Sequence, residues 1–526
     1  MARLSSHLAA FLSVCLPVVG LAQTADPGSP TLVVMITVDG LRASDLEKHG
    51  SQFTGGLARF IKQGAWFTNA HQDHAITETA PGHASLLSGR FPRSTGIAAN
   101  RVGVLDQATP LLGTSGVAGA SPKRFQGTAL FDWIRAKDKR SRALSVSTKD
   151  RGAILPIGKA KEQVYWYPGD GSFTTSTYYT TALPEWVTSY NARSLARSYA
   201  GRDWTLLLPE SAYSEPDAVS AEGAGRDNVF PHPTPSEPER VASWLRATPF
   251  IDELTASFAL EGVRATGLGS GPQTDLLAIS LSATDAINHR LGPDSREAHD
   301  QLLRTDRVIG QFLDSLFRLR DSSRVVVALS ADHGFTTIPE LAAAGGNPQA
   351  TRATLEDALV VARAKMKEMG VDTAAIDIDQ QIVLLDRQAF QRGGKNPQPV
   401  LDAFIEAARK TPGVARVDKF ASLLTKDTLT DPIARRWSHQ FPAGTNVELV
   451  ATQTPGTLWT TLLVASHGSP YDADSHVPIM FLGAGFKPGR YTQFVRTVDV
   501  APTLARVLRV TPLEKLDGAP LTAVLR

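Results

Sequence analysis

Short apolar stretches rich in β-branched residues recur along the chain, and they predict buried strands. The first, at residues 31–38, reads TLVVMITV and ends at Asp39-Gly40, which is typical of a central strand that opens into a loop at its carboxyl end. Their lengths are those of strands rather than helices. Similar stretches lie at residues 143–146, 276–281, 324–329, 458–464 and 477–482.

Helical patterns separate these stretches. Between residues 296 and 320, apolar side chains recur every three or four positions from Leu302 to Phe317, so this segment is predicted to be an amphipathic helix that packs on a sheet. Strands that alternate with helices predict an α/β fold in which helices cover both faces of a mainly parallel central sheet. In such folds the chemistry lies at the carboxyl ends of the strands.

Two long segments interrupt this alternation. Residues 156–272 are rich in Tyr, Trp, Ser and Pro, and residues 338–456 carry Gly-Gly and Pro-rich stretches around helical patches such as residues 353–367. We interpret both segments as insertions that cap the edge of the sheet over the site. The main domain is therefore expected to span residues 30–526 with these two insertions.

The first 22 residues have the features of a secretory signal peptide. A basic residue near the start precedes an apolar run at residues 8–21, and Gly20 and Ala22 are small residues at the −3 and −1 positions of a cleavage site. A short membrane anchor is the alternative, but the run is shorter than the ~18 residues that a spanning helix needs. We therefore expect a secreted, periplasmic protein that begins at Gln23 and lacks cysteine, because Cys15 is the only cysteine.

Composition and charge exclude several classes of protein. Hydrophobic residues make up 42% of the 526 residues, as in globular proteins, and 54 basic against 52 acidic side chains leave a formal net charge of +2. No long block of one charge marks a nucleic-acid or membrane-surface partner. No glycine-rich phosphate-binding loop follows a predicted strand, so a nucleotide would be bound only as a substrate.

Acidic and imidazole side chains gather where the predicted strands end, and the carboxyl ends of parallel strands meet at one rim of a sheet. The i,i+4 spacing of Asp285 and His289 also places both on one face of a helical turn. We therefore expect six groups to face a common site: Asp39, Asp285, His289, Asp332, His333 and His476.

Mixed aspartate and histidine ligation suits zinc, which binds such groups at ~2.0–2.2 Å. Six ligands divide into two three-ligand sites that each keep an open position, and this is a catalytic arrangement, because structural zinc is closed by four ligands. Each residue alone has a simpler interpretation. Asp39 could form a turn before Gly40, and most of the 12 histidines should be ordinary surface or capped residues. Their combination favours two zinc ions.

Seven motifs follow one another between Leu32 and about Leu508. They are Thr37-Val-Asp39-Gly, Thr79-Ala-Pro-Gly-His83, Gly96-Ile-Ala-Ala-Asn100, Thr284-Asp285 with His289 and Gly292-Pro293, Ala331-Asp332-His333-Gly, Ser475-His476-Val-Pro and Val498-Asp-Val-Ala-Pro-Thr-Leu504. In this order they resemble the alkaline phosphatase superfamily, in the branch of the nucleotide pyrophosphatases/phosphodiesterases and the phosphate-irrepressible (PafA-type) alkaline phosphatases. The resemblance implies a three-layer α/β/α alkaline-phosphatase-like fold.

The resemblance also implies a nucleophile, Thr79, which attacks phosphorus and forms a phosphothreonine. An alcohol is a poor nucleophile near neutral pH, so a zinc ion must stabilise its alkoxide. Thr77 is a rival, and helix capping before Pro81 is the non-catalytic alternative, but the register to Pro-Gly-His favours Thr79. The family pattern assigns two metal sites, one formed by Asp39, Asp332 and His333 with Thr79, and the other by Asp285, His289 and His476.

Three further residues bear on the substrate. Asn100 matches the family asparagine that donates to a non-bridging phosphate oxygen, and Lys149 and Arg151 resemble the Lys-x-Arg pair of the PafA-type monoesterases, which diesterases of the branch lack. A monoester exposes an additional charged oxygen, and a lysine point charge with an arginine fork would stabilise it in the transition state. A solvated turn with two basic residues is the alternative.

Two positions depart from the family pattern. Thr95 stands where the branch has a histidine, and Arg101-Val102 replaces an aromatic-bearing segment, so the leaving-group preference stays open. We predict a monomeric two-zinc alkaline phosphatase that hydrolyses small-molecule phosphate monoesters and has no nucleic-acid or membrane partner. A nucleotide pyrophosphatase/phosphodiesterase is the alternative enzyme. A non-catalytic metal- or phosphate-binding protein is the alternative from another class, although binding alone needs no nucleophile.

Overall fold

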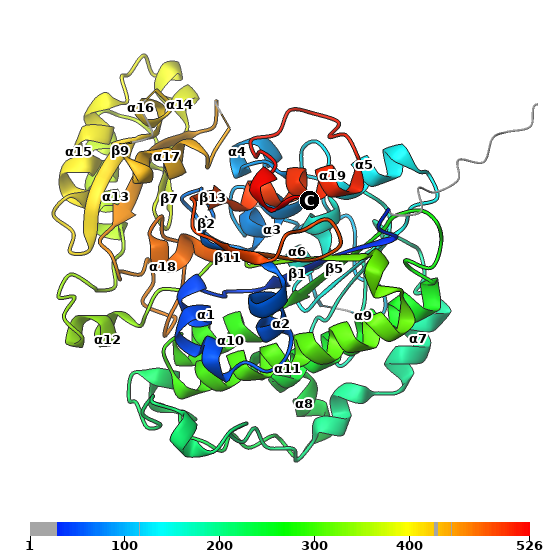
Figure 1. Cartoon of the computed structure of the whole chain (residues 1–526). Coiled ribbons are helices and arrows are strands. Elements are labelled where there is room, and N and C mark those ends of the chain that lie inside the picture. The colour runs from blue at the N-terminus through cyan, green and yellow to red at the C-terminus, as the bar shows by residue number, and fades with distance from the viewer. Residues whose placement is uncertain (1–28, 102, 115, 426–429, 443) are drawn as a thin grey trace, which may run out of the picture.

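The structure is a computed structural model that describes residues 29–101, 103–114, 116–425, 430–442 and 444–526. The predicted signal peptide, residues 1–22, lies outside these residues. The larger of two sheets crosses the centre of the molecule (Figure 1). Its strands are β1 (Leu32–Val38), β2 (Ala65–His71), β3 (Ala143–Ser147), β4 (Gln163–Trp166), β5 (Asp275–Leu281), β6 (Val325–Ser330), β11 (His476–Gly483), β12 (Gly489–Tyr491) and β13 (Val495–Arg496).

The strand order of this sheet is β12-β2-β11-β6-β1-β5-β3-β4, and β13 pairs with β2. β1 lies at the centre and pairs in parallel with β5 on one side and with β6 on the other. β3 and β4 continue the parallel arrangement, whereas β11 runs antiparallel to both β6 and β2. The prediction of a mainly parallel central sheet is therefore confirmed.

Successive side chains of a strand point to opposite faces, so β1 contributes side chains to two hydrophobic cores. Val34 and Ile36 join the core on one face, and Val33 and Met35 join the core on the other. Figure 1 shows helices on both faces. The first face carries α1 (Ala43–His49), α2 (Gly56–Gln63), α9 (Phe250–Thr266), α10 (Ala283–Leu291) and α11 (Arg296–Leu319), and the second carries α3 (Thr79–Ser88), α4 (Pro92–Thr95), α5 (Leu130–Lys137), α6 (Asp150–Ile154) and α19 (Val500–Leu508).

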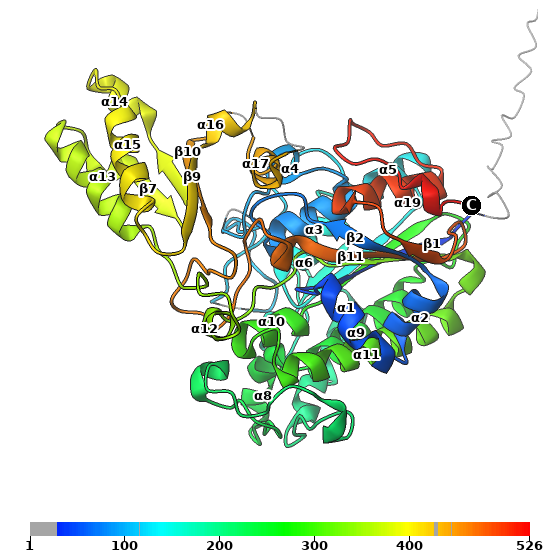
Figure 2. The same cartoon turned by 60° about the vertical axis from the view of Figure 1, so that its left-hand side comes forward.

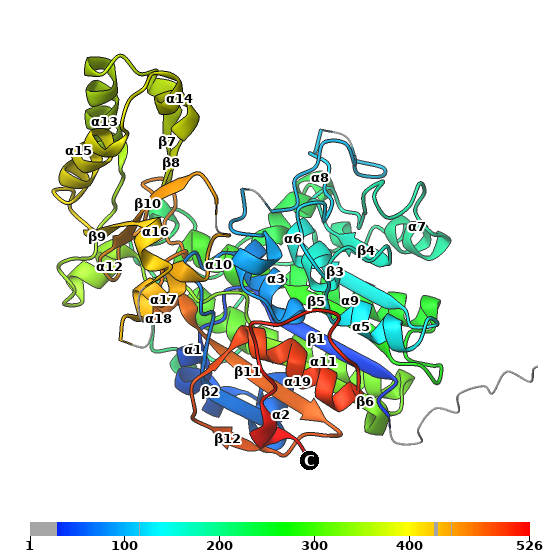
Figure 3. The same ribbon diagram turned by 90° about the horizontal axis from the view of Figure 1, so that it is seen from above.

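The second predicted insertion contains a small sheet of its own, whose strands are antiparallel in the order β7-β8-β10-β9. Its core lies between the sheet and α13 and α15, and it includes Leu359 and Phe404. Figures 2 and 3 show these two helices standing away from the main sheet. The elements are α12 (Pro339–Ala344), α13 (Glu356–Glu368), β7 (Ile376–Asp379), β8 (Ile382–Leu385), α14 (Arg387–Arg392), α15 (Gln398–Ala408), β9 (Val414–Lys419), α16 (Phe420–Leu423), α17 (Pro432–Ser438) and β10 (Val447–Gln453).

The opposite face of the small sheet is the one that contacts the main domain. Phe420 and Trp437 pack there with Ile76 and Ala98, which belong to the segments before and after α3. The range predicted as the first insertion, residues 156–272, includes β4 of the main sheet and α9 of its first face, so only the segment between them is an insertion. This segment contains α7 (Glu185–Ala192) and α8 (Pro238–Trp244). It lies against α9 and α11, where Trp204 Nε1 donates to Asp300 Oδ2 at 2.7 Å.

One predicted strand does not form. Residues 458–464 are an irregular segment in which Leu462 is 91% exposed, and the Arg352 guanidinium donates to the carbonyls of Leu463 and Val464. The amphipathic helix predicted at residues 296–320 is present as α11. In the described part of the chain, none of the helices combines the length and the apolar character needed to cross a bilayer.

Candidate active site

Three neighbouring strands, β5, β1 and β6, deliver the acidic side chains of the candidate site. Asp39 directly follows β1, Asp285 lies in the first turn of α10 after β5, and Asp332 and His333 follow β6. These side chains are buried, and Asp39, Asp332 and His333 are fully so. His333 Nε2 lies 3.3 Å from Asp39 Oδ1, and 3.7 Å from both Asp285 Oδ1 and Asp332 Oδ2. The structure therefore brings these four predicted residues together.

His289 joins this group from the next turn of α10, with Nε2 at 3.4 Å from Asp285 Oδ1. His467 also joins it, with Nε2 at 3.4 Å from the same oxygen and with its ring stacked 3.5 Å from that of His333. We call these residues the active-site cluster: Asp39, Asp285, His289, Asp332, His333 and His467.

The histidines of the active-site cluster share one orientation. Nδ1 of His289, His333 and His467 donates to the carbonyls of Ala465, Gly334 and Thr77, at 2.9, 2.8 and 2.7 Å respectively. Because each Nδ1–H donates to a carbonyl, the tautomer is fixed and the lone pair of each Nε2 faces the carboxylates. This is the way in which metal-binding histidines are held.

The predicted ligand His476 is not part of the active-site cluster. It is the first residue of β11, where its Nε2 donates to Thr68 O at 2.7 Å and its ring stacks on His71. Because β11 is antiparallel and begins beyond the end of β6, its first residue pairs with β2 and lies away from β1 and β5. This corrects the placement expected from the sequence. His467 occupies the position, and its signal was the Ser466-His-Gly segment of the preceding loop.

Buried carboxylates dominate the electrostatics of the cluster. Burial, together with Asp285 and Asp332, raises the pKa of Asp39. Burial would also raise the pKa of Asp285, but Lys149 and His289 outweigh it and hold this pKa well below its usual range. Lys149 Nζ lies 2.6 Å from Asp39 Oδ2 and 2.6 Å from Asp285 Oδ2. Two carboxylates thus contact one ammonium group, and the Asp332 carboxylate adds a further negative charge to the cluster, which is an environment that attracts cations.

The donor atoms of the cluster fit metal ions. Asp39 Oδ1, Asp285 Oδ1, Asp332 Oδ2 and His333 Nε2 are buried and have no hydrogen-bond partner among the described residues. Asp285 belongs to two groups of three residues, one with His289 and His467 and one with Asp39 and His333. Within each group, one ligand atom from each residue lies within 4.8 Å of the other two. Mixed oxygen and imidazole donors suit zinc.

Thr79 is the first residue of α3, and its hydroxyl faces this cluster. Lys149 Nζ lies 3.4 Å from Thr79 Oγ1. The rival, Thr77, is committed elsewhere, because its Oγ1 donates to Ser469 O at 2.9 Å. The turn that holds Thr79 is tight, since a Cβ on Gly82 would lie 2.1 Å from the carbonyl oxygen of Asp332. The Pro-Gly-His motif therefore lets α3 approach the end of β6.

His83 explains the last residue of that motif. Its Nδ1 lies 2.9 Å from Thr79 O and 3.1 Å from Asp332 Oδ2, and its Nε2 lies 2.9 Å from Ser280 Oγ. The ring is fully buried. His83 thus contacts the first residue of α3, the end of β5 and a carboxylate of the cluster, and it packs behind that carboxylate.

Asn100 lies beside the N-terminus of α3. Its Oδ1 accepts from the Ala80 amide at 2.8 Å, which leaves the side-chain NH2 without a partner among the described residues, and its own amide donates to Glu78 at 2.6 Å. Arg151 lies in α6, next to Lys149, and its buried Nε likewise lacks a partner in the described structure. Both residues offer unused donors.

The second insertion closes one side of this region. A cavity of about 290 Å³ lies between the segment that bears Asn100 and the β7–β8 turn, and it is lined by Glu78, Asn100, Arg101, Asp379 and Gln380, among others. The Arg101 guanidinium and the Asp379 carboxylate form an ion pair of 3.1 Å across it. Arg101, which departs from the family pattern, thus ties the insertion to the pocket wall.

Comparisons with known proteins agree with this geometry. A family model described as type I phosphodiesterase / nucleotide pyrophosphatase matches residues 33–418. Alkaline phosphatase PhoV of Synechococcus elongatus is 30% identical over 94% of this chain and 93% of its own length, and alkaline phosphatase PafA of Elizabethkingia meningoseptica is 29% identical over 96% of both. The crystal structure of PafA matches with a TM-score of 0.87 at 28% identity, covering 95% of this chain and 99% of PafA.

The chain belongs to the type I phosphodiesterase / nucleotide pyrophosphatase family. Within that family it is an alkaline phosphatase, because four relatives that it matches over at least 94% of its length are named alkaline phosphatases and its fold is that of PafA. The family and the fold inferred from the sequence motifs are confirmed. The relatives and the active-site cluster together identify a metal-dependent enzyme.

Proposed function

We propose that this enzyme hydrolyses phosphate monoesters to an alcohol and inorganic phosphate through a phosphothreonine at Thr79, with two zinc ions as cofactors. The observation that carries the proposal is the position of Thr79 Oγ1 at the N-terminus of α3, 3.4 Å from Lys149 Nζ, which itself contacts Asp39 and Asp285. A hydroxyl in this position has no use in a protein that only binds metal or phosphate.

The cluster divides into two sets of ligands. Asp39, Asp332 and His333, together with Thr79, would hold one zinc ion. Asp285, His289 and His467 would hold the other. When bound, the two ions would favour the alkoxide form of the threonine and stabilise the charge on the leaving oxygen.

The chain's own groups account for the transfer of the phosphoryl group. Thr79 Oγ1 attacks phosphorus while the bond to the alcohol oxygen breaks on the opposite side, and the alcohol leaves with a proton. Water then attacks the phosphothreonine, releases phosphate and restores the hydroxyl. The side-chain NH2 of Asn100 donates to a non-bridging oxygen beside the N-terminus of α3, and a helix N-terminus favours an anion.

Lys149 and Arg151 support a preference for monoesters. Lys149 carries its positive charge beside Thr79, Arg151 follows two residues later, and a monoester presents one more charged oxygen than a diester. A second PafA crystal structure, 27% identical with a TM-score of 0.87, is of a variant changed at a threonine, an asparagine, a lysine and an arginine. These are the residue types that we assign here to catalysis and phosphate binding.

The family name leaves a phosphodiesterase as the second candidate. The cavity beside Asn100 could receive a second ester substituent, although the carboxylates of Glu78 and Asp379 line it. Measuring kcat/KM for an aryl phosphate monoester and for the matching diester separates the candidates. We expect the monoester to be the better substrate, and a clear preference for the diester would reject our proposal.

Secretion, the metal count and the monomeric state are also part of the proposal. The exported protein should begin at Gln23, and an intact mass that retains residues 1–22 would contradict this. Chelation should abolish activity, zinc should restore it, and elemental analysis should show that combining Asp39→Asn with Asp285→Asn removes two zinc ions per chain. Light scattering should give the mass of one chain, since nothing in the proposed site requires a second copy.

A further inference from the structure

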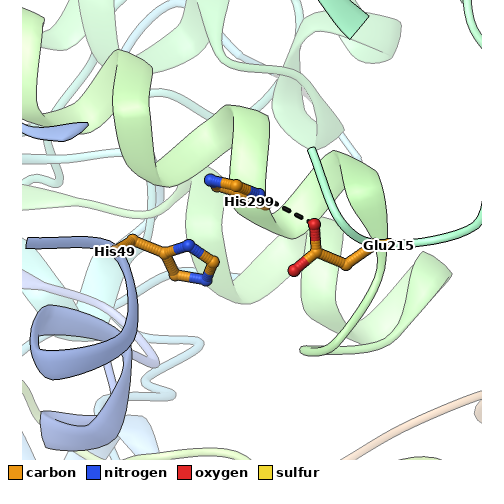
Figure 4. A group of neighbouring side chains, drawn as sticks. All are labelled: His49, Glu215 and His299. Atoms are coloured by element: carbon orange, nitrogen blue, oxygen red, sulfur yellow. Dashed lines mark hydrogen bonds and ion pairs between the residues drawn. The ribbon is translucent and has the colours of Figure 1, made fainter. Parts of the chain in front are cut away.

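A second group of histidine and carboxylate side chains lies outside the active-site cluster (Figure 4). His49 is the last residue of α1, His299 lies in the first turn of α11, and Glu215 belongs to the first insertion. All three side chains are buried, and one ligand atom from each lies within 4.8 Å of the other two. Three segments that are far apart in the sequence therefore converge here.

An outer hydrogen bond fixes the His299 ring, as in the active-site cluster, but here Nε2 makes that bond and Nδ1 faces the group. Gln52 Nε2 donates to Ala212 O at 2.8 Å, so its Oε1 must be the atom that faces His299 Nε2, at 2.6 Å. His299 Nε2 therefore donates to this amide oxygen. The other ring nitrogen, Nδ1, lies 2.8 Å from Glu215 Oε2 and faces the group. An outer hydrogen bond of this kind is what fixes the tautomer of a metal-binding histidine.

The surroundings also contain unused polar atoms. The His49 ring accepts and donates no hydrogen bond within the described structure, and its centroid lies 3.8 Å from that of His299. Asn288 is 1% exposed, and its Oδ1 has no hydrogen-bond partner among the described residues. It lines a cavity of about 10 Å³ together with His49, Glu215 and His299. A buried acceptor without a donor, beside a small cavity, points to a missing ligand or its bound water.

We propose that His49, Glu215 and His299 form a structural zinc site, distinct from the active-site cluster, which ties α1 and α11 to the first insertion. Two imidazoles and one carboxylate are a ligand set that zinc prefers. The ion replaces the proton that lies between His299 Nδ1 and Glu215 Oε2, so one proton is released for each ion bound. A water molecule in the fourth position donates to Asn288 Oδ1.

Lys48 does not compete for the same oxygen. Its Nζ lies 2.7 Å from Glu215 Oε1, and its side chain is 49% exposed, so Oε2 remains available to an ion. The site also borders α10. Asn288 lines its cavity, and Asp285 and His289 of the same helix belong to the active-site cluster. A zinc ion here supports the helix that carries two catalytic ligands.

The test compares zinc content between variants of the full chain. The protein is stripped with a chelator, reloaded with zinc chloride, freed of excess zinc by gel filtration and analysed for zinc per chain. We expect His49→Asn and Glu215→Gln each to hold one zinc fewer than the parent. The matched control is His232→Asn, another buried histidine between two carboxylates, Asp227 and Glu297. It should hold as much zinc as the parent. If His49→Asn and Glu215→Gln hold as much zinc as the parent, the proposal is overturned.

A second measurement keeps the proposal testable if those variants fold poorly, and it does not depend on the proposed function. Combining Asp39→Asn with Asp285→Asn disables the active-site cluster, because each of its two proposed sets of ligands then loses a carboxylate. Zinc should still raise the melting temperature of this variant, and adding Glu215→Gln should abolish that rise. The difference holds whatever number of ions the active centre binds. A melting temperature that zinc leaves unchanged in the variant with Asp39→Asn and Asp285→Asn contradicts a separate site.

Discussion

Replacing both Lys149 and Arg151 by alanine should reduce monoester hydrolysis far more than diester hydrolysis. Lys149 Nζ lies 3.4 Å from Thr79 Oγ1, the atom that would receive the phosphoryl group, and Arg151 is two residues further along in α6. A hydrogen bond to a charged group contributes ~1.5–3 kcal/mol, which corresponds to about ten- to a hundredfold in rate when it forms mainly in the transition state. Even with incomplete additivity, two such contacts predict a loss of at least ~10²-fold in kcat/KM for monoesters.

The assay is kcat/KM for an aryl monoester and its matching diester in the parent and the double variant. Lys149 also contacts Asp39 and Asp285, so zinc per chain must be measured in parallel to separate substrate binding from metal binding. Lys159→Ala, at an exposed position, is the control and should leave both substrates unaffected. Equal losses for monoester and diester, at unchanged zinc content, would refute the reasoning, because the pair would then contact a group common to both substrates.

Two further predictions concern other sites. Thr79→Ala should lose nearly all turnover and should fail to trap phosphate covalently. Thr77→Ala should keep most activity, because the Thr77 hydroxyl donates to Ser469 O. If steady-state rates showed the reverse order, Thr77 would be the nucleophile. Burial, together with Glu297 and Asp217, raises the pKa of Glu222 from 4.5 to about 8. Between these two pH values the folded state holds a proton that the unfolded state has lost. The free energy of unfolding should therefore fall as pH rises from about 4.5 through about 8. Calorimetry of Glu222→Gln should show a flatter pH dependence of the melting temperature, and an unchanged slope would exclude this group as the cause.

Strand positions near the site could be predicted because they carry a strong local signal. β1, β5 and β6 are continuous apolar runs, buried on both faces, and each is followed by chemistry-bearing residues. The small sheet of the second insertion carries no such signal. β7 reads IDID, with only its first residue buried, and so short and polar a segment becomes a strand only through its partner β8 and the helices packed behind. Residues 458–464 show the opposite error, since apolar character without a neighbouring strand gives no sheet.

The candidate metal ligands show the same limit at the level of single residues. Asp39, Asp285, Asp332 and His333 could be predicted because each follows a parallel strand, and such strands end at one rim. The choice between His467 and His476 could not be made in this way. It depends on the direction of β11 and on its pairing with β2, and both are long-range properties of the sheet.

A matched pair of substitutions tests this assignment. His467→Asn removes a ring whose Nε2 faces Asp285, whereas His476→Asn removes one that donates to Thr68 O and stacks on His71. Residues that only orient a ligand typically change metal affinity by 10–100-fold, so loss of a direct ligand should weaken one zinc ion by more than about a hundredfold. His467→Asn should therefore lose zinc and activity together, and excess zinc should restore part of the activity. His476→Asn should keep its zinc content, with an effect confined to thermal stability. If His476→Asn lost the ion and His467→Asn kept it, the loop that carries His467 would have to move away and β11 would have to supply the ligand.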